Sequence, residues 1–158
     1  MIFMQLESEL KSKQFKTAEE KTVVNIIYTA YRLNDRLASM LTPFRITIQQ
    51  YNLLRILRGQ YPEYASVNLL KERMLDKNSG VSRLIEKLRR KGLVSCCTHK
   101  ADRRQTEVKI LPAGLKMLEE INHAAANLHR SAKILTPDHL SALNRYLDKL
   151  RTNLPSTG

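Results

Sequence analysis

The stretch VSRLIEKLRRKGLVSCCTHKADRRQTEVKIL, residues 81–111, changes its hydrophobic period halfway along, and this change decides the fold class. In its first part, apolar residues recur at i, i+3, i+4 and i+7, which predicts a helix with one buried face that ends at Gly92. From Leu93 onward the runs LVSCCTH and TEVKIL, separated by the polar KADRRQ, predict a two-stranded hairpin. Because an isolated hairpin is only marginally stable, we expect it to pack against helices. The apolar helix positions are Val81, Leu84, Ile85 and Leu88.

Three helices are predicted before this stretch, each with a polar residue at its start. The first is long and amphipathic. The third is barely more than two turns long, and the polar DKNSG separates it from the helix that begins at Val81. The starting residues are Thr17, which forms a capping box with Glu20, then Thr47 and Ser66; the breaks are Pro43 and the pair Gly59 and Pro62.

Two further helices are predicted after it. Pro112 is suited to the first turn of a helix that runs to about Arg130. Thr136 can cap the last helix, with Pro137 at its first position and Asp138 at the positive end of its dipole. The apolar sides are Leu115, Leu118, Ile121, Ala125 and Leu128 in the first helix, and Leu140, Leu143, Leu147, Leu150 and Leu154 in the second.

This order of elements predicts a mainly α fold with a small β-hairpin wing, that is, a winged helix-turn-helix. In a helix-turn-helix, the second of the two helices can lie in the DNA major groove. We expect one domain over 1–158, with a winged helix-turn-helix DNA-binding lobe at 47–111. The helices at 17–41 and 112–154 carry long apolar stripes that a small lobe cannot bury alone, which predicts a helical dimerisation region and a homodimer.

The charge of the chain favours a polyanionic partner. Lys and Arg outnumber Asp and Glu by 27 to 15 over 158 residues. Between Lys71 and Lys116 the count is 13 against 5, so this third of the chain holds +8 of the net +12. Such a cluster can neutralise DNA phosphates, which makes binding sensitive to salt.

Candidate DNA-binding residues lie opposite the apolar face of the helix at 81–92 and in the hairpin. Arg83 could bond bidentately to guanine, and serines of this face could reach either base type. The hairpin tip could lie along the DNA backbone with one guanidinium in a narrow minor groove, and Asp102 could orient an arginine. The expected set is Lys77, Asn78, Ser79, Ser82, Arg83, Lys87, Asp102, Arg103 and Arg104, with Glu86 and Arg90 on the same helix face.

Residues 48–114 resemble the MarR family of bacterial transcription regulators, and the flanking helices fit as well. The pieces that carry the resemblance are VSRLIEKLRRKGLV, which is similar to the family's recognition helix and the start of its wing, and DRR followed ten residues later by Gly114. The resemblance implies an obligate homodimer on a pseudo-palindromic operator, usually a repressor released by a small molecule or by oxidation. It assigns Ser79, Ser82 and Arg83 to the major groove, and Asp102 and Arg104 to the wing.

Two positions depart from the family pattern. Cys96 stands where an arginine is common at the root of the wing, so one habitual contact is expected to be missing. Leu111 stands where a threonine usually caps the next helix, which leaves Pro112 to start that helix with a weaker cap.

Cys96 and Cys97 are adjacent in a predicted strand, so they point to opposite faces and are poorly placed to bridge each other. Oxidant sensing is a second interpretation, because cationic neighbours could lower a thiol pKa. The four histidines and two cysteines show no metal-ligand spacing, and no metal or cofactor is expected. Either core packing or a pocket for a small aromatic effector would account for the tyrosines, which are Tyr28, Tyr31, Tyr51, Tyr61 and Tyr64.

Other function classes find less support in the sequence. No phosphate loop, nucleophile elbow or acid pair points to an enzyme. The N-terminus lacks a signal-peptide pattern and no apolar run is long enough to cross a bilayer, so a soluble, cytoplasmic, nucleoid-associated protein is expected. Two alternatives remain open: a basic architectural protein that binds DNA without sequence preference, and a winged-helix adaptor that holds a protein partner.

Overall fold

The structure is a computed structural model that describes residues 5–11, 14–98 and 106–154. Its order is α1 (Leu6–Leu10), α2 (Ala18–Leu41), the 3-10 turn η1 (Thr42–Phe44), α3 (Ile48–Arg58), β1 (Ala65–Ser66), α4 (Val67–Arg73), α5 (Val81–Arg90), β2 (Val94–Thr98), β3 (Thr106–Ile110), α6 (Pro112–Arg130), the 3-10 turn η2 (Ser131–Ile134) and α7 (Pro137–Thr152). The fold is mainly helical with one small antiparallel sheet, as the sequence predicts.

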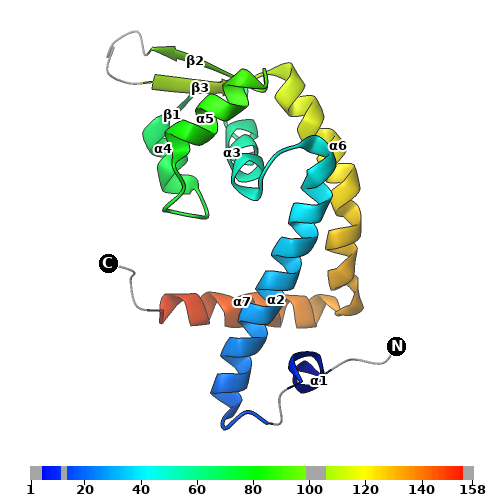
Figure 1. Ribbon diagram of the computed structural model, residues 1–158. Coiled ribbons are helices and arrows are strands. Elements are labelled where there is room, and N and C mark those ends of the chain that lie inside the picture. The colour runs from blue at the N-terminus through cyan, green and yellow to red at the C-terminus, as the bar shows by residue number, and fades with distance from the viewer. Residues whose placement is uncertain (1–4, 12–13, 99–105, 155–158) are drawn as a thin grey trace.

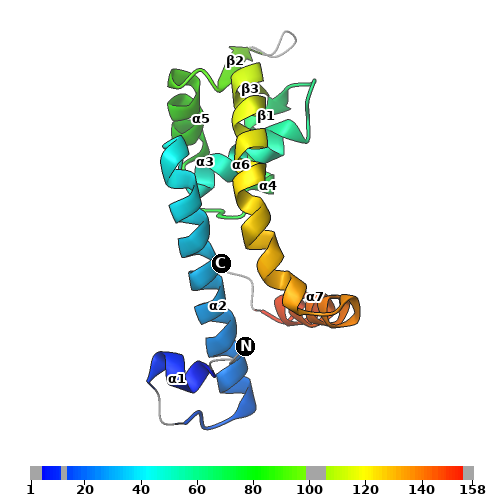
Figure 2. The ribbon, with the colours of Figure 1, turned by 90° about the vertical axis from the view of Figure 1, so that its right-hand side faces the viewer.

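The chain divides visibly into a lobe and a helical stem (Figure 1). Helices α3, α4 and α5 and the sheet gather at one end, and we call this part, residues 48–110, the winged lobe. The stem consists of α2, α6 and α7, of which α2 and α6 contact each other as they lead away from the lobe. Helix α7 lies crosswise at the far end of α6, and α1 lies against the far end of α2 (Figure 2).

The helix boundaries follow the start and stop signals of the sequence. Thr17 accepts the backbone N–H of Glu20 at the start of α2, but the Glu20 carboxylate accepts the N–H of Lys16 and not that of Thr17, so only half of the expected capping box forms. At α3 both halves form, between Thr47 and Gln50. Gly92 ends α5 with φ +68°, a conformation that a glycine adopts without strain.

The sheet has three strands instead of the two that were predicted. β2 and β3 form the expected hairpin, with Val94 opposite Ile110 and Thr98 opposite Thr106. The two residues of β1 then pair with β3 on its other edge, Ala65 opposite Val108. This short strand ties the start of α4 to the wing, because Ser66 both pairs with β3 and caps α4 through the N–H of Leu69.

Two further points differ from prediction: helix α1 was not predicted, and Leu154 lies beyond the end of α7. Gly59 is the C-cap of α3, so that helix ends where it was predicted to end, with the glycine in the right-handed helical region.

The hydrophobic core lies in the winged lobe and reaches into the adjoining ends of α2 and α6. Leu53, Leu54 and Leu57 of α3 are buried against strand residues such as Val108. The hairpin therefore packs against helices, as its expected instability in isolation requires. The remaining members from the wing and from α5, α2 and α6 include Val94, Ile110, Ile85, Leu88, Leu41, Leu118 and Ile121.

Candidate nucleic-acid interface

Helix α5 holds one face in the core and offers the other to solvent. Val81, Ile85 and Leu88 are buried, so the helix cannot turn about its axis. Ser82 and Arg83 consequently stand exposed in its first turn. Short donors and a guanidinium on a helix held in this way are the groups that can read base edges in a major groove.

The turn before α5 is ordered by its own side chains. Asp76 Oδ1 accepts the N–H of Asn78 at 3.0 Å, and the Ser79 hydroxyl donates to the Asp76 carbonyl at 2.7 Å. The Lys77 ammonium donates to the Glu72 carbonyl. Ser79 therefore has its hydroxyl proton engaged within the turn, so its oxygen is free to accept but not to donate.

Glu86 organises the C-terminal half of α5 in a way that the sequence analysis missed. Its carboxylate accepts both Nε and a terminal nitrogen of Arg89, at 2.9 and 3.1 Å, and Nε of Arg90 at 2.9 Å. These bonds, with Arg89 the larger influence, hold the pKa of the Glu86 carboxyl at about 2. Glu86 is thus an anion that aligns two arginines. The i, i+3 and i, i+4 spacing of Arg89 and Arg90 from Glu86 could have predicted these ion pairs.

A cationic groove adjoins this part of α5. It has a volume of about 410 Å³ and lies between the start of α3 and the second half of α5. Of its residues, only Lys87 was in the predicted DNA-binding set. The lining residues are Arg45, Thr47, Gln50, Lys87, Arg90 and Lys91.

The wing is described only up to the base of its tip. The residues predicted at that tip, Asp102, Arg103 and Arg104, lie outside the described residues. Its root is fixed by a close approach of α6. A Cβ built on Gly114 would stand 2.5 Å from the Leu93 carbonyl and 2.8 Å from Cγ1 of Ile110, so only glycine fits. This contact explains the glycine that follows the DRR motif.

The two cysteines of β2 are free thiols and exposed. The expectation that cationic neighbours lower a thiol pKa is wrong for Cys96. Partial desolvation raises its pKa above the ordinary value, and the favourable charge of Arg89 does not compensate. A raised pKa leaves less thiolate at neutral pH, and thiolate is the form that oxidants attack.

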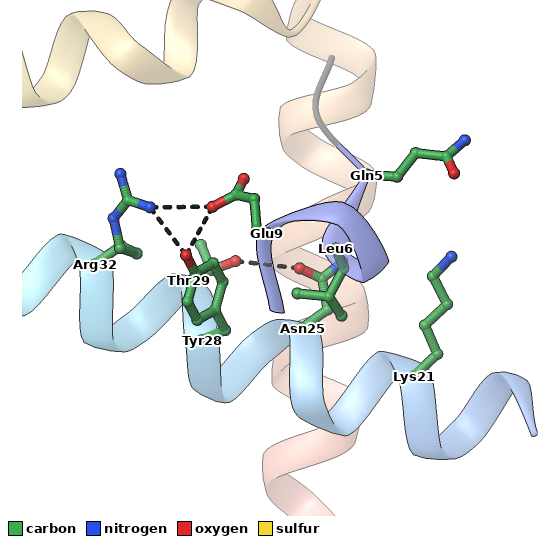
Figure 3. Close-up of a pocket in the computed structure, with 8 residues that line it drawn as sticks. All are labelled: Gln5, Leu6, Glu9, Lys21, Asn25, Tyr28, Thr29 and Arg32. Carbon is green, nitrogen blue, oxygen red and sulfur yellow. Dashed lines mark hydrogen bonds and ion pairs between the residues drawn. The ribbon is translucent and has the colours of Figure 1, made fainter. Parts of the chain in front are cut away.

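The tyrosines are spread over the molecule and do not line one common pocket. Tyr51 is buried in the core, while Tyr31, Tyr61 and Tyr64 are exposed. Tyr28 alone of the five lines the cavity of about 450 Å³ between α1 and α2 (Figure 3). There its hydroxyl donates to Glu9 at 2.7 Å, and Arg32 bonds both groups at 3.0 Å. Core packing accounts for Tyr51 and local polar contacts account for Tyr28.

The described residues form neither a metal-binding cluster nor a membrane-spanning helix. No group of three or more His, Cys, Asp or Glu side chains among them could hold a metal ion. Likewise, in the described part of the chain, no helix is both long and apolar enough to span a membrane.

Solved structures of MarR regulators match almost the whole chain. The MarR transcription factor of Planctomyces limnophilus superimposes with a TM-score of 0.66 and 28% identity, over 85% of this chain and 98% of its own. A mutant MarR of E. coli bound to operator DNA gives 0.70 and 22%, over 96% and 100%. The chain has the MarR-family fold.

A third MarR-fold neighbour is BpsR of Bordetella bronchiseptica, with a TM-score of 0.74 and 21% identity over 90% of this chain and 100% of its own. In that protein 6-hydroxynicotinic acid regulates DNA binding. No family model and no curated protein sequence matches the chain. Of these neighbours, the Planctomyces limnophilus protein is a MarR transcription factor and the E. coli mutant is bound to operator DNA.

Proposed function

We propose that the protein is a sequence-specific DNA-binding transcription regulator that acts as a homodimer on a pseudo-palindromic operator. The observation that carries the proposal is the two-sided α5, with Val81, Ile85 and Leu88 fixed in the core and Ser82 and Arg83 exposed. A rigid helix with this exposed face matches the requirements of base reading. The net charge of +12 supplies the attraction to phosphate.

The homodimer is supported by apolar residues that one chain leaves exposed outside the winged lobe. In α2, Ile27 is 64% exposed, and in α7, Tyr146 is 61% exposed. No described residue of α7 is buried. Apolar side chains gathered on the helices of the stem mark an association surface. A two-fold dimer would set the two α5 helices about 34 Å apart, one turn of DNA. The other exposed members are Leu10, Val23, Tyr31, Leu33, Ile134, Leu143 and Leu154.

The regulator acts as a repressor that a small-molecule or an oxidative signal releases. Regulation of BpsR by an aromatic acid supports a small aromatic effector for a protein of the same fold. The raised pKa of Cys96 disfavours an oxidative signal through that thiol. Oxidation would regain support if peroxide weakened DNA binding by the wild type but not by the Cys96→Ser, Cys97→Ser double variant. A protein with this function would act in the cytoplasm, at the nucleoid.

Titration against two duplexes separates this proposal from its alternatives. We expect a palindromic fragment from the neighbourhood of the protein's own gene to bind on the order of a thousandfold more tightly than a scrambled fragment, at both low and moderate salt. Equal affinities would favour a basic architectural protein. No binding to either duplex at low salt would favour a protein-interaction adaptor.

A further inference from the structure

A cavity lies between α1 and α2, at the end of the stem that is far from the winged lobe (Figures 1 and 3). Its volume of about 450 Å³ is within the range of small-molecule sites. Polar side chains from both helices surround it, with Leu6 as an apolar member. The lining residues are Gln5, Leu6 and Glu9 from the first segment, and Lys21, Asn25, Tyr28, Thr29 and Arg32 from α2.

The side of α2 that lines this cavity is not the apolar side that pairing of two copies would cover. A helix turns by about 100° per residue, so Lys21, Asn25 and Arg32 share one side of α2. Val23 and Ile27, both exposed, point to roughly the opposite side. A second copy that packs on the apolar side therefore leaves the cavity open to a ligand.

At one end of the cavity, Glu9 and Arg32 present opposite charges side by side. Arg32 Nη1 donates to Glu9 Oε2 and to the Tyr28 hydroxyl, both at 3.0 Å, and that hydroxyl donates to the same carboxylate oxygen at 2.7 Å (Figure 3). These bonds use one nitrogen and one oxygen of the ion pair. In the described part of the chain, Glu9 Oε1 and the other two nitrogens of the Arg32 guanidinium have no partner. An acceptor and several donors thus remain available next to each other.

Helix α1 is held on α2 by few contacts. It has five residues, too few for a stable helix on its own, and Leu6 is the buried one among them. Glu7 Oε1 pairs with Lys21 at 2.5 Å, but Glu7 Oε2 is buried without a hydrogen-bond partner in the described part of the chain. A buried acceptor that lacks a donor weakens the packing around it. Helix α1 can therefore shift to admit a ligand, and a ligand that bonds to it will hold it more firmly.

The charges around the cavity favour a ligand that carries both signs. Lys21 and Arg32 balance Glu7 and Glu9, so these surroundings are neutral overall. A simple anion at the Glu9–Arg32 pair would be repelled by the carboxylate, and a simple cation by the guanidinium. An α-amino acid has an ammonium and a carboxylate on one carbon, so it can donate to the free Glu9 oxygen and accept from the free Arg32 nitrogens at once.

We propose that this cavity binds a free α-amino acid with an apolar side chain, which places its ammonium on Glu9, its carboxylate on Arg32 and its side chain against Leu6. Leu6 and Glu9 are three residues apart and so lie on one face of α1. The bound amino acid links α1 to α2. This inference goes beyond the proposed DNA-binding function and does not rest on it, because no residue of the winged lobe takes part.

Titration calorimetry of the full chain without DNA tests the site. The probes are L-alanine, L-leucine, L-methionine and L-phenylalanine, and we expect at least one to bind saturably. For L-leucine, 4-methylpentanoate lacks the ammonium and leucinamide lacks the carboxylate. Each analogue should bind on the order of tenfold more weakly than L-leucine, because it leaves one charge of the Glu9–Arg32 pair without a partner. Saturable binding of none of the four probes, or equal binding of an amino acid and its two analogues, would overturn the proposal.

Substitutions assign the two ends of the ligand. Arg32→Gln should bind L-leucine on the order of tenfold more weakly and no longer distinguish it from leucinamide, while Glu9→Gln should lose the distinction from 4-methylpentanoate. A general disturbance of the fold would not remove the two distinctions separately. Arg58→Gln and Glu19→Gln are the matched controls, because both residues are exposed and lie outside the cavity. Both controls should keep the affinity and both distinctions.

Hydrogen exchange locates the ligand even if a substituted chain folds poorly. In the wild type, the backbone N–H of Glu9 bonds to the Gln5 carbonyl at 3.2 Å within α1. A ligand that joins α1 to α2 should slow the exchange of this N–H, because it opposes local opening of the helix. If L-leucine binds and the exchange of α1 is unchanged, the ligand lies elsewhere and the assignment to this cavity is wrong.

Discussion

Arg83 is the residue on which sequence preference should depend most. It is exposed in the first turn of α5, and a guanidinium can bond both acceptors of a guanine at once. We expect Arg83→Ala to cost about 1 to 3 kcal/mol of binding to the specific duplex and to relax the preference at one base pair in each half-site. Fluorescence anisotropy with duplexes changed one base pair at a time measures both effects.

Lys87→Ala is the comparison for Arg83→Ala. Lys87 lies one turn further along α5 and lines the cationic groove, so its removal should weaken all sequences alike and lower the salt slope. The assignment of α5 as the reading helix would be wrong if Arg83→Ala preserved the ranking of the duplexes while Lys87→Ala altered it.

At the scale of the elements, Gly114 determines how closely α6 can approach the wing. An added Cβ would meet the Leu93 carbonyl, which is backbone and cannot rotate away. We expect Gly114→Ala to lower the free energy of unfolding by about 1 to 3 kcal/mol through overpacking. Thermal denaturation measures the loss. Gly80→Ala serves as the control, because its Cβ would make only an ordinary contact with Arg83 at 3.9 Å. Equal stability of the two variants would contradict the close packing.

Glu86 gives α5 a pH dependence whose direction can be worked out. Its pKa is about 2 in the folded chain and 4.5 without its arginine partners. Because the folded value is lower, the stabilisation is fully present above pH 4.5 and is lost as the pH falls through 2. The stability difference between wild type and Glu86→Gln should therefore be constant near neutral pH and shrink between pH 4.5 and 2. Urea titrations at several pH values measure it, and a constant difference throughout would exclude the ion pairs.

The sequence predicted the periodic helices and the hairpin, but it did not predict β1 or α1. Periodic apolar residues and clear caps placed α2, α3, α5, α6 and α7 within a few residues. β1 has only two residues, so it shows no period, and it exists because β3 offers it an open edge. Helix α1 is one turn and a half of mixed residues whose position depends on Glu7 and Glu9 meeting Lys21 and Arg32 of α2. Contacts of this kind form between segments and leave no local pattern.

The sequence likewise predicted some residues of the candidate site and could not predict others. The exposed face of α5 followed from its helical period, so Ser82, Arg83 and Lys87 could be placed beforehand. Arg45 and Gln50 could not, because they meet α5 only through the packing of α3 against it. The direction of the Cys96 pKa shift was predicted wrongly. The shift depends mainly on desolvation, which the neighbouring charges in the sequence do not reveal.

On the scale of the whole molecule, the stem of one chain is incomplete. The hydrophobic core lies in the winged lobe and in the adjoining ends of α2 and α6. Helix α7, at the far end of the stem, has no buried residue among those described (Figure 2). An amphipathic helix of 16 residues gains little stability in water from its own backbone, so its apolar side chains call for a partner surface. A second copy supplies one and also places two α5 helices on one face of a duplex.

Substitution of the exposed stem residues tests this dimer. We expect the wild type to sediment at twice the 18.2 kDa of one chain, and Ile27→Asp or Tyr146→Asp to shift it toward a single chain, because each places a charge on a surface that pairing would desolvate. Leu75→Asp is the control: Leu75 is 82% exposed but lies in the winged lobe, so the dimer should persist. A stem variant that becomes a single chain should also lose its preference for a two-half-site duplex over a one-half-site duplex, since each lobe would then bind alone. A wild type that stays a single chain at high concentration, or stem variants that remain dimeric, would contradict pairing through α2 and α7.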